Sequence, residues 1–372
     1  MEDFFINIAT IALAVLGAAA GTAYAQSNVT IYGVVDTGYV KKTGVDTGMD
    51  ENVNSRIGFK GVEDLGGGLK ATFQLEKRFN VNDGTNNSKN NKDWEGAANV
   101  GLKGDDWGAI RLGRMNGIAT ENIRKFDPFY QYGVGGMWDS TQRGVRRDNM
   151  IRFDSLDYAG FSFQAAYELG KNMNDKSREP DASKAKLTDG DRSYGRDNDG
   201  YQLGINYKNG GFAATANYQM LADSNRSSLW NVGVSYSWDT VKLEALYQQT
   251  KDKQFGYDAD WADDVSYNSR YNSVTEQQAL LGVEWKVGPG RLNASVQWLS
   301  ADGSVSNYAG DGTLDDDAWK VAVGYTYNLS KRTSLYGIVS YADYDDKDIG
   351  GFIDGIAQDS ATGVQIGITH KF

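Results

Sequence analysis

Apolar and polar residues alternate along the chain from residue 28 to its C-terminus. In residues 69–76, 201–207 and 319–327, apolar side chains occupy every second position. Such alternation is typical of β-strands, because successive side chains point to opposite faces of a sheet. After residue 26 no segment carries the apolar spacing of an amphipathic helix. The pattern therefore predicts an all-β protein.

Sixteen segments carry this strand pattern, and the connections between them alternate between short and long. The predicted strands are 29–40, 54–62, 68–80, 97–104, 108–115, 148–155, 160–169, 200–208, 211–219, 229–238, 240–250, 276–286, 290–300, 317–328, 332–344 and 361–372. The short connections consist mostly of Gly, Asn and Asp, and the long polar ones are 41–53, 81–96, 116–147, 170–199, 220–228, 251–275, 301–316 and 345–360. An even number of strands with turns at one rim and loops at the other predicts a 16-stranded antiparallel transmembrane β-barrel with short periplasmic turns and long extracellular loops. The alternative, a soluble β-sandwich, would show less regular loop lengths.

Aromatic residues mark the ends of the apolar faces of these strands. Tyr207 and Phe212 flank one short turn, Tyr236 and Trp238 end another strand, and Trp298 lies near the opposite end of its strand. Tyr and Trp side chains favour the boundary between lipid and water. Their recurrence at strand ends predicts two aromatic girdles around the barrel.

Residues 4–25 form the one long apolar run, which ends in the small-residue pattern Ala23-Tyr24-Ala25, and residues 1–25 are the predicted signal peptide. This pattern predicts a cleaved signal peptide, followed by a single barrel domain over residues 26–372. Glu2 and Asp3 depart from the usual basic start of such a peptide, and a membrane-anchoring helix is the alternative. The expected location is the outer membrane of a Gram-negative bacterium.

The composition narrows the chemistry that the chain can perform. It has no Cys and a single His, His370, near its end, so common hydrolase triads, thiol catalysis and His-rich metal sites are disfavoured. The 38 basic and 49 acidic residues give a net charge of −11, which argues against a nucleic-acid partner. We therefore expect no enzyme activity, no cofactor and no metal site.

Several segments resemble the general porins of Gram-negative bacteria, which are trimeric diffusion channels. They are residues 29–36, 55–70, 100–104, 108–114 and the closing segment 364–372, which ends in Phe372. The resemblance implies a homotrimer in contact with outer-membrane lipid and lipopolysaccharide, with Phe372 as the signal for the barrel-assembly machinery. It also implies that the third long loop folds into the lumen, and that ions and small hydrophilic solutes diffuse through a water-filled channel.

The third long connection, residues 116–147, is the expected constriction loop. Its segment 126–136 is similar to the Pro-Glu-Phe-Gly-Gly loop tip of the family, but Phe129 follows Pro128 and the Glu is missing. Acidity on the loop would have to come from Glu121 and Asp127. This departure puts the usual cation preference of the family in doubt.

Alternation predicts that Arg56, Arg78, Arg111 and Arg152 point into the lumen, and the resemblance places Arg56 and Arg146 on a basic wall facing the loop. At Arg111 the alternation is interrupted. Opposed charges on wall and loop would create a transverse field, and selectivity would follow from pore radius and these charges. For each of these residues, a solvated lumen position or a salt bridge that holds the loop is an equal alternative.

A substrate-selective sugar or anion channel is the first alternative function. A sugar channel would need aromatic side chains along the inner wall, whereas most aromatics here have the outward parity. An outer-membrane hydrolase would need a base, and His370 also has the outward parity. An adhesin built from the long loops is compatible with a channel.

Overall fold

The computed structural model describes residues 28–87, 92–138, 145–170, 199–222, 226–252, 255–256, 269–307, 310–354, 356 and 358–372. The predicted signal peptide lies outside these residues and stays a prediction.

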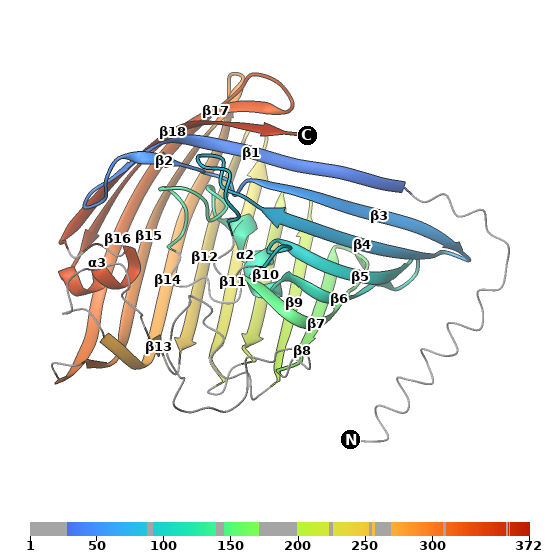
Figure 1. The fold of residues 1–372 in the computed structure, drawn as a ribbon, viewed down its shortest axis with the longest axis horizontal. Helices are drawn as coiled ribbons and strands as arrows, with labels where there is room; N and C mark the ends of the chain where they lie inside the picture. Colours follow the sequence, from blue (N-terminus) through green and yellow to red (C-terminus); the bar gives the residue numbers. More distant parts are fainter. Residues whose placement is uncertain are drawn as a thin grey trace.

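Sixteen long strands form a closed antiparallel ring, as predicted (Figure 1). They are β1 (Asn28–Lys42), β3 (Arg56–Gly66), β4 (Leu69–Arg78), β5 (Ala97–Gly104), β6 (Gly108–Asn116), β7 (Arg146–Asp154), β8 (Phe161–Glu168), β9 (Gly200–Asn209), β10 (Phe212–Met220), β11 (Ser228–Trp238), β12 (Val241–Asp252), β14 (Ser269–Val287), β15 (Gly290–Asn307), β16 (Gly310–Asn328), β17 (Thr333–Tyr344) and β18 (Ser360–Lys371). Two short strands, β2 (Gly48–Asp50) and β13 (Phe255–Gly256), pair with β1 and β14. The ring closes where β1 pairs with β18 on one side and with β3 on the other.

The C-terminal Phe372 lies at this closure. Its backbone N–H donates to the carbonyl of Gly33 at 3.1 Å, and the Gly33 N–H donates back at 3.0 Å. A Cβ on Gly33 would lie 2.3 Å from the Phe372 ring, so only glycine allows the ring to pack here. The role of Phe372 as an assembly signal stays a prediction.

Four strands extend well beyond their predicted ends. β3 continues to Gly66, β14 begins at Ser269, β15 ends at Asn307 and β16 begins at Gly310. The predicted loops 251–275 and 301–316 are therefore partly strand. Outside the lipid, a hairpin keeps its backbone hydrogen bonds without an apolar face, so hydrophobic alternation stops before the strand does.

Two helices interrupt the long loops, although the apolar spacing predicted none. They are α2 (Ile118–Ile123), followed by the 3₁₀ turn η1 (Arg124–Phe126), and α3 (Lys347–Asp354). Helices of six and eight residues are too short for their periodicity to stand out in the sequence. Within the described part of the chain, no helix is long and apolar enough to cross a bilayer.

The outer face of the ring is apolar and bordered by aromatic side chains. Leu281, at 67% exposure, is the most exposed of many outward hydrophobic residues. At the short-turn end, Tyr207 packs 4.4 Å from Phe161 and Tyr236 packs 6.0 Å from Trp238. Further aromatic pairs lie toward the long-loop end of β9 to β12. These positions agree with the two predicted girdles.

The inner face is polar and hydrogen-bonded from strand to strand. Asn217 donates to Asn231 at 2.8 Å, and Asn231 donates to Gln248 at 3.0 Å. All three side chains are buried. Such a polar wall gives the loop that follows β6 a surface rich in hydrogen-bonding groups.

Candidate functional site: the constriction

Loop 116–147 lies against the inner wall of the barrel, and Figure 1 shows α2 inside the ring. Glycines on inward positions make room for it. A Cβ on Gly233 of β11 would lie 2.7 Å from Phe126, and one on Gly282 of β14 would lie 2.3 Å from Pro128. The predicted inward fold of this loop is therefore seen in the described residues 116–138 and 145–147.

Side chains of the wall hold the helix α2 in place. The Ile118 N–H donates to the Gln202 side chain at 2.7 Å. Asn122 donates to Gln164 at 2.5 Å and to Asn217 at 2.7 Å. The same wall also holds the second half of the loop: Asn293, Gln297 and Lys320 donate to loop carbonyls at positions 128, 135 and 136, at 2.8, 3.0 and 2.6 Å. The loop is thus fastened along much of its length.

Asp127 does not face the channel, although the sequence placed it among the acidic lumen residues. Its side chain is fully buried and accepts backbone N–H groups of Phe129 at 2.9 Å, Gln131 at 2.8 Å and Met137 at 3.0 Å. Burial raises the pKa of Asp127, and the N–H donors and the Lys320 charge oppose that rise. The Asp127 carboxylate therefore stabilises the fold of the loop through these three hydrogen bonds. The sequence gives no sign of this role, because it does not show which backbone groups the side chain contacts.

Glu121, the other predicted loop acid, forms an ion pair with Arg152 at 2.9 Å. Arg152 is fully buried and also contacts Asp154 at 2.7 Å, and Arg111 contacts Asp154 at the same distance. Arg152 was predicted to line the pore, but it holds the loop, which was the alternative interpretation. Through Asp154, Arg111 belongs to the same network of ion pairs as Arg152 and Glu121.

Arg56, Arg78 and Arg146 lie together on the predicted basic wall, from β3, β4 and β7. Glu76 lies 3.8 Å from Arg56 and 2.8 Å from Arg78. Glu95 lies 3.6 Å from Arg146. The buried Nε and Nη1 of Arg78 and the Nε of Arg146 have no hydrogen-bond partner. These three arginines therefore share two carboxylates.

The sequence missed Arg114, which extends this wall. Its guanidinium contacts Glu95 at 2.7 Å and Asp148 at 2.6 Å, and Asp148 also contacts Lys92 at 2.8 Å. The pairing of β6 with β7 shifts register between Gly113 and Met115. This irregularity explains why Arg114 breaks the alternation that begins at Arg111.

Arg124, on the loop, was not predicted as a site residue, and it faces this wall. Its guanidinium lies 5.2 Å from the centre of the Tyr132 ring, and it donates to the Tyr132 hydroxyl at 3.4 Å and to Gln131 at 3.2 Å. Within the described residues, no carboxylate lies within ion-pair distance of Arg124. An Arg before a loop tip gives no signal in the sequence that its side chain will lie near other arginines.

Two tyrosines of the loop report different electrostatic surroundings. Burial alone would raise the pKa of Tyr132, but the positive charges of Arg124, Arg56, Arg78 and Arg146 outweigh it and lower that pKa. Burial and the charge of Glu284 raise the pKa of Tyr130. The side of the loop that carries Tyr132 is therefore the strongly positive one.

The region around Tyr132 and the basic wall, here called the eyelet, has a positive balance of charge. The ion-paired group on the wall contains five cations and three carboxylates: Arg56, Arg78, Arg114, Arg146 and Lys92, with Glu76, Glu95 and Asp148. Arg124 adds a further positive charge from the loop. The transverse field expected from an acidic loop opposite a basic wall is therefore absent from the described part of the eyelet.

The closed ring and its inward loop agree with what is found in known proteins. Residues 12–347 match the family described as Gram-negative porin. The chain belongs to this family. It is 30% identical to an outer membrane porin protein of Bordetella pertussis, with 97% of this chain and 99% of the relative aligned. It is 32% identical to outer membrane porin protein 32 of Delftia acidovorans, again over 97% and 99%.

Among solved structures, the anion-selective porin from Comamonas acidovorans is similar in fold. Its TM-score is 0.70 at 26% sequence identity, over 93% of this chain and all of that one. The chain is thus an outer-membrane porin, a barrel that forms a channel for passive diffusion of ions and small hydrophilic solutes. Family membership points to a channel rather than to an enzyme.

Proposed function

We propose that this porin passes anions in preference to cations. The observation that carries the proposal is the positive charge on both sides of the eyelet, with Asp127 buried inside the loop and Glu121 paired with Arg152. The positive charges of the eyelet stabilise an anion there and destabilise a cation. Since the charges that line a constriction set ion selectivity, we expect anions to pass more readily. The anion-selective title of the similar solved structure supports the same preference.

The test is a measurement of the zero-current potential of the refolded porin in a planar bilayer across a KCl gradient. We expect large ohmic conductance steps and a potential whose sign shows that chloride is more permeant than potassium. The magnitude should fall as the salt concentration rises, since screening shortens the reach of the eyelet charges. A potential of the opposite sign at low salt would exclude the proposal.

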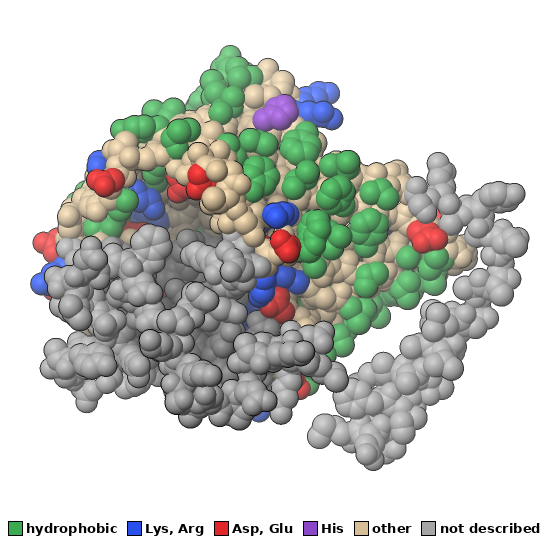
Figure 2. All heavy atoms as spheres, in the orientation of Figure 1, with side chains coloured by type: hydrophobic (Ala, Val, Ile, Leu, Met, Phe, Trp, Pro, Cys, Tyr) green, Lys and Arg blue, Asp and Glu red, His purple; other side chains and the backbone are tan. Residues whose placement is uncertain are grey.

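We also propose that the porin is a homotrimer whose subunits meet through β3 to β6. Each long strand from β8 to β17 carries at least one Tyr or Trp, whereas β3, β4, β5 and β6 carry none. The outer face of these four strands is nonetheless apolar, with Val100 at 58% and Leu112 at 48% exposure (Figure 2). An apolar face without interfacial aromatics fits a protein contact better than a lipid contact.

Single cysteines can test this face, because the chain contains none. A spin label at Val100→Cys should be shielded from oxygen dissolved in the bilayer. A label at Val234→Cys, a control on β11 with 46% exposure, should be accessible. Equal accessibility of both labels, or migration of the unheated protein as a monomer, would contradict the proposed interface.

A further inference from the structure

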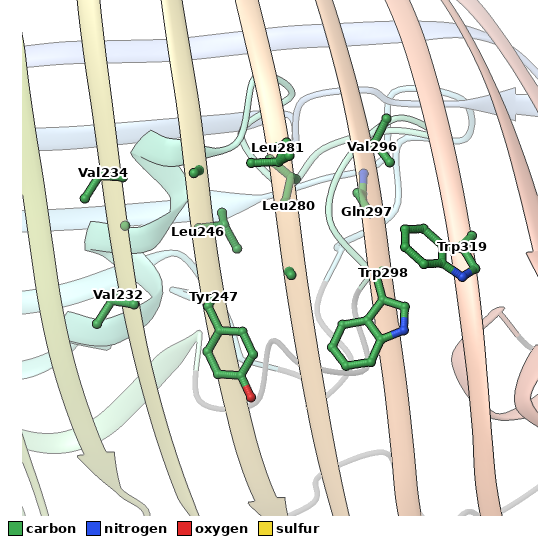
Figure 3. Close-up of a pocket in the computed structure, with 13 residues that line it drawn as sticks. Val232, Val234, Leu246, Tyr247, Leu280, Leu281, Val296, Gln297, Trp298 and Trp319 are labelled. Carbon is green, nitrogen blue, oxygen red and sulfur yellow. The ribbon is translucent and has the colours of Figure 1, made fainter.

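The inner wall of the barrel becomes apolar at the long-loop end of β14 to β17. On β15, Val296 and Trp298 lie on the lipid-facing surface, and Gln297 between them points inward to the constriction loop (Figure 3). Leu299 and Ala301 continue this inward row and are fully buried. They belong to a cluster of buried side chains on four strands, here called the mouth patch: Val274, Leu299, Ala301, Leu314, Ala318, Ala342 and Tyr344. An apolar patch on the wall of a water-filled channel is unfavourable unless another element covers it.

The helix α3 supplies this cover from the last long loop. Ile349 and Ile353 are four residues apart, so they lie on one face of the helix, and both are buried against the mouth patch. Beyond the helix, Ile356 is also buried and lies against Gly44 of the loop after β1, where a Cβ would be only 2.9 Å from the isoleucine Cγ2. Figure 1 shows α3 beside β16. Since the patch belongs to the inner wall, α3 lies inside the mouth of the channel.

The constriction loop meets α3 at the carboxylate of Asp354. Trp138, in the second half of this loop, is 2% exposed and packs in the same cluster as the mouth patch. Its indole N–H donates to Oδ2 of Asp354 at 3.1 Å, and the Tyr344 hydroxyl donates to the same oxygen. The ammonium group of Lys320 lies 4.4 Å from the centre of the Trp138 ring. The loop, the helix and the wall are therefore joined at Asp354.

A continuous chain of contacts leads from Asp354 to the eyelet. Trp138 directly follows Met137, whose sulfur accepts a hydrogen bond from the Gln131 side chain at 3.6 Å. The oxygen of the same Gln131 side chain accepts a hydrogen bond from Nε of Arg124 at 3.2 Å. A shift of Trp138 therefore acts on the side chain that holds Arg124.

The backbone at the tip of the loop needs support from both sides. Tyr130 and Gln131 have φ angles of 56° and 63°, in the left-handed region that residues other than glycine disfavour. Conformations of this kind persist only where the surrounding contacts hold them. Asp127 holds the tip from its own side through the hydrogen bonds described above, and Trp138 holds the segment that leaves it.

We propose that Asp354 is a positioning residue of the channel, which holds Trp138 and, through it, the second half of the constriction loop. While Asp354 accepts both hydrogen bonds, α3 stays on the mouth patch and Arg124 stays in the eyelet. When the bonds are lost, Trp138 leaves its place and the tip of the loop relaxes toward ordinary backbone angles. The proposal concerns the shape of the channel and holds for either sign of its ion preference.

Single-channel recording of the refolded porin with Asp354→Leu tests this role. Leu has a similar branched shape but accepts no hydrogen bond, so the constriction loop should leave its position more often. The fraction of time spent in conductance levels other than the main one should rise about tenfold, as expected from the loss of a hydrogen bond to a charged group. Asp348→Leu, the same change at an exposed position of the same helix, is the matched control and should behave as wild type.

Asp354→Asn separates the hydrogen bonds from the charge. Since both donors bind one oxygen, an asparagine carbonyl in that position accepts both, and this variant should record like wild type. Trp138→Phe removes the indole N–H and keeps an aromatic ring, so it should populate the same extra conductance levels. Its combination with Asp354→Leu should add little to either change, because both substitutions break the same contact.

Migration of the unheated samples verifies that each variant is a folded barrel. If folded Asp354→Leu records like Asp348→Leu, Asp354 does not position the loop and the proposal fails. If Asp354→Asn behaves like Asp354→Leu, the charge of Asp354 is what matters, and the proposed hydrogen-bonded contact is wrong. Additive effects of Trp138→Phe and Asp354→Leu would show that the two residues act separately, which would also contradict the proposal.

Discussion

The substitution Arg124→Glu is expected to move the zero-current potential strongly toward zero, because the net charge of the eyelet groups falls from +3 to +1. It replaces the loop cation that stacks on Tyr132 with a carboxylate close to Arg56, Arg78 and Arg146. A change of two elementary charges at ~6 Å in a water-filled pore alters the energy of a monovalent ion by about 1.4 kcal/mol, or tenfold in its occupancy. Because anions and cations respond in opposite directions, the permeability ratio changes by more than either occupancy alone.

Two further variants separate charge at the eyelet from general effects. Arg124→Gln removes one charge and keeps a hydrogen-bonding side chain, so it should lie between wild type and Arg124→Glu. Arg332→Glu makes the same charge change at an exposed position next to β17, far along the chain from the eyelet, and should leave the potential nearly unchanged. If Arg332→Glu shifted the potential as far as Arg124→Glu, selectivity would come from the net charge of the porin and not from the eyelet.

The positions of the strands could be predicted from the sequence because the bilayer imposes the pattern. Every second residue of a membrane strand faces lipid and must be apolar, and this constraint located all sixteen strands. Where strands leave the lipid, as β14 does toward Ser269, the constraint ends and the pattern no longer marks the strand. The register shift after Gly113 likewise depends on pairing between strands, which a single strand sequence does not contain.

The constriction was predicted only in outline. The length and order of the loop indicated its inward path. The missing Glu after Pro128 raised doubt about cation preference, and that doubt stays a prediction. The alternation of strand residues shows which side chains point inward, but not what they contact. It could not show that Arg152 is buried in an ion pair with Glu121, because this pair joins a strand to a separate loop. Nor could it show that Arg124 turns toward the wall, since loop residues follow no period.

Asp127→Asn is expected to loosen the second half of the constriction loop. One carboxylate oxygen accepts the N–H groups of Gln131 and Met137, and the other accepts that of Phe129. In either orientation of an asparagine amide, its NH₂ group faces at least one of these donors and leaves it unsatisfied. Hydrogen bonds to charged groups contribute about 1.5–3 kcal/mol each, so the loop should lose on the order of 3 kcal/mol of local stability.

The channel measurement distinguishes this structural role from a role as a lumen charge. A loosened loop no longer holds Arg124 and Tyr132 opposite the basic wall, so single-channel conductance should rise and anion preference should fall. Removal of an exposed lumen carboxylate would instead strengthen anion preference at nearly constant conductance. Asp106→Asn, at an exposed turn between β5 and β6, is the matched control and should change neither quantity. The thermal unfolding of the barrel should remain close to wild type, because none of the three bonds belongs to the strand ring; a large loss of thermal stability would show that Asp127 supports the barrel itself.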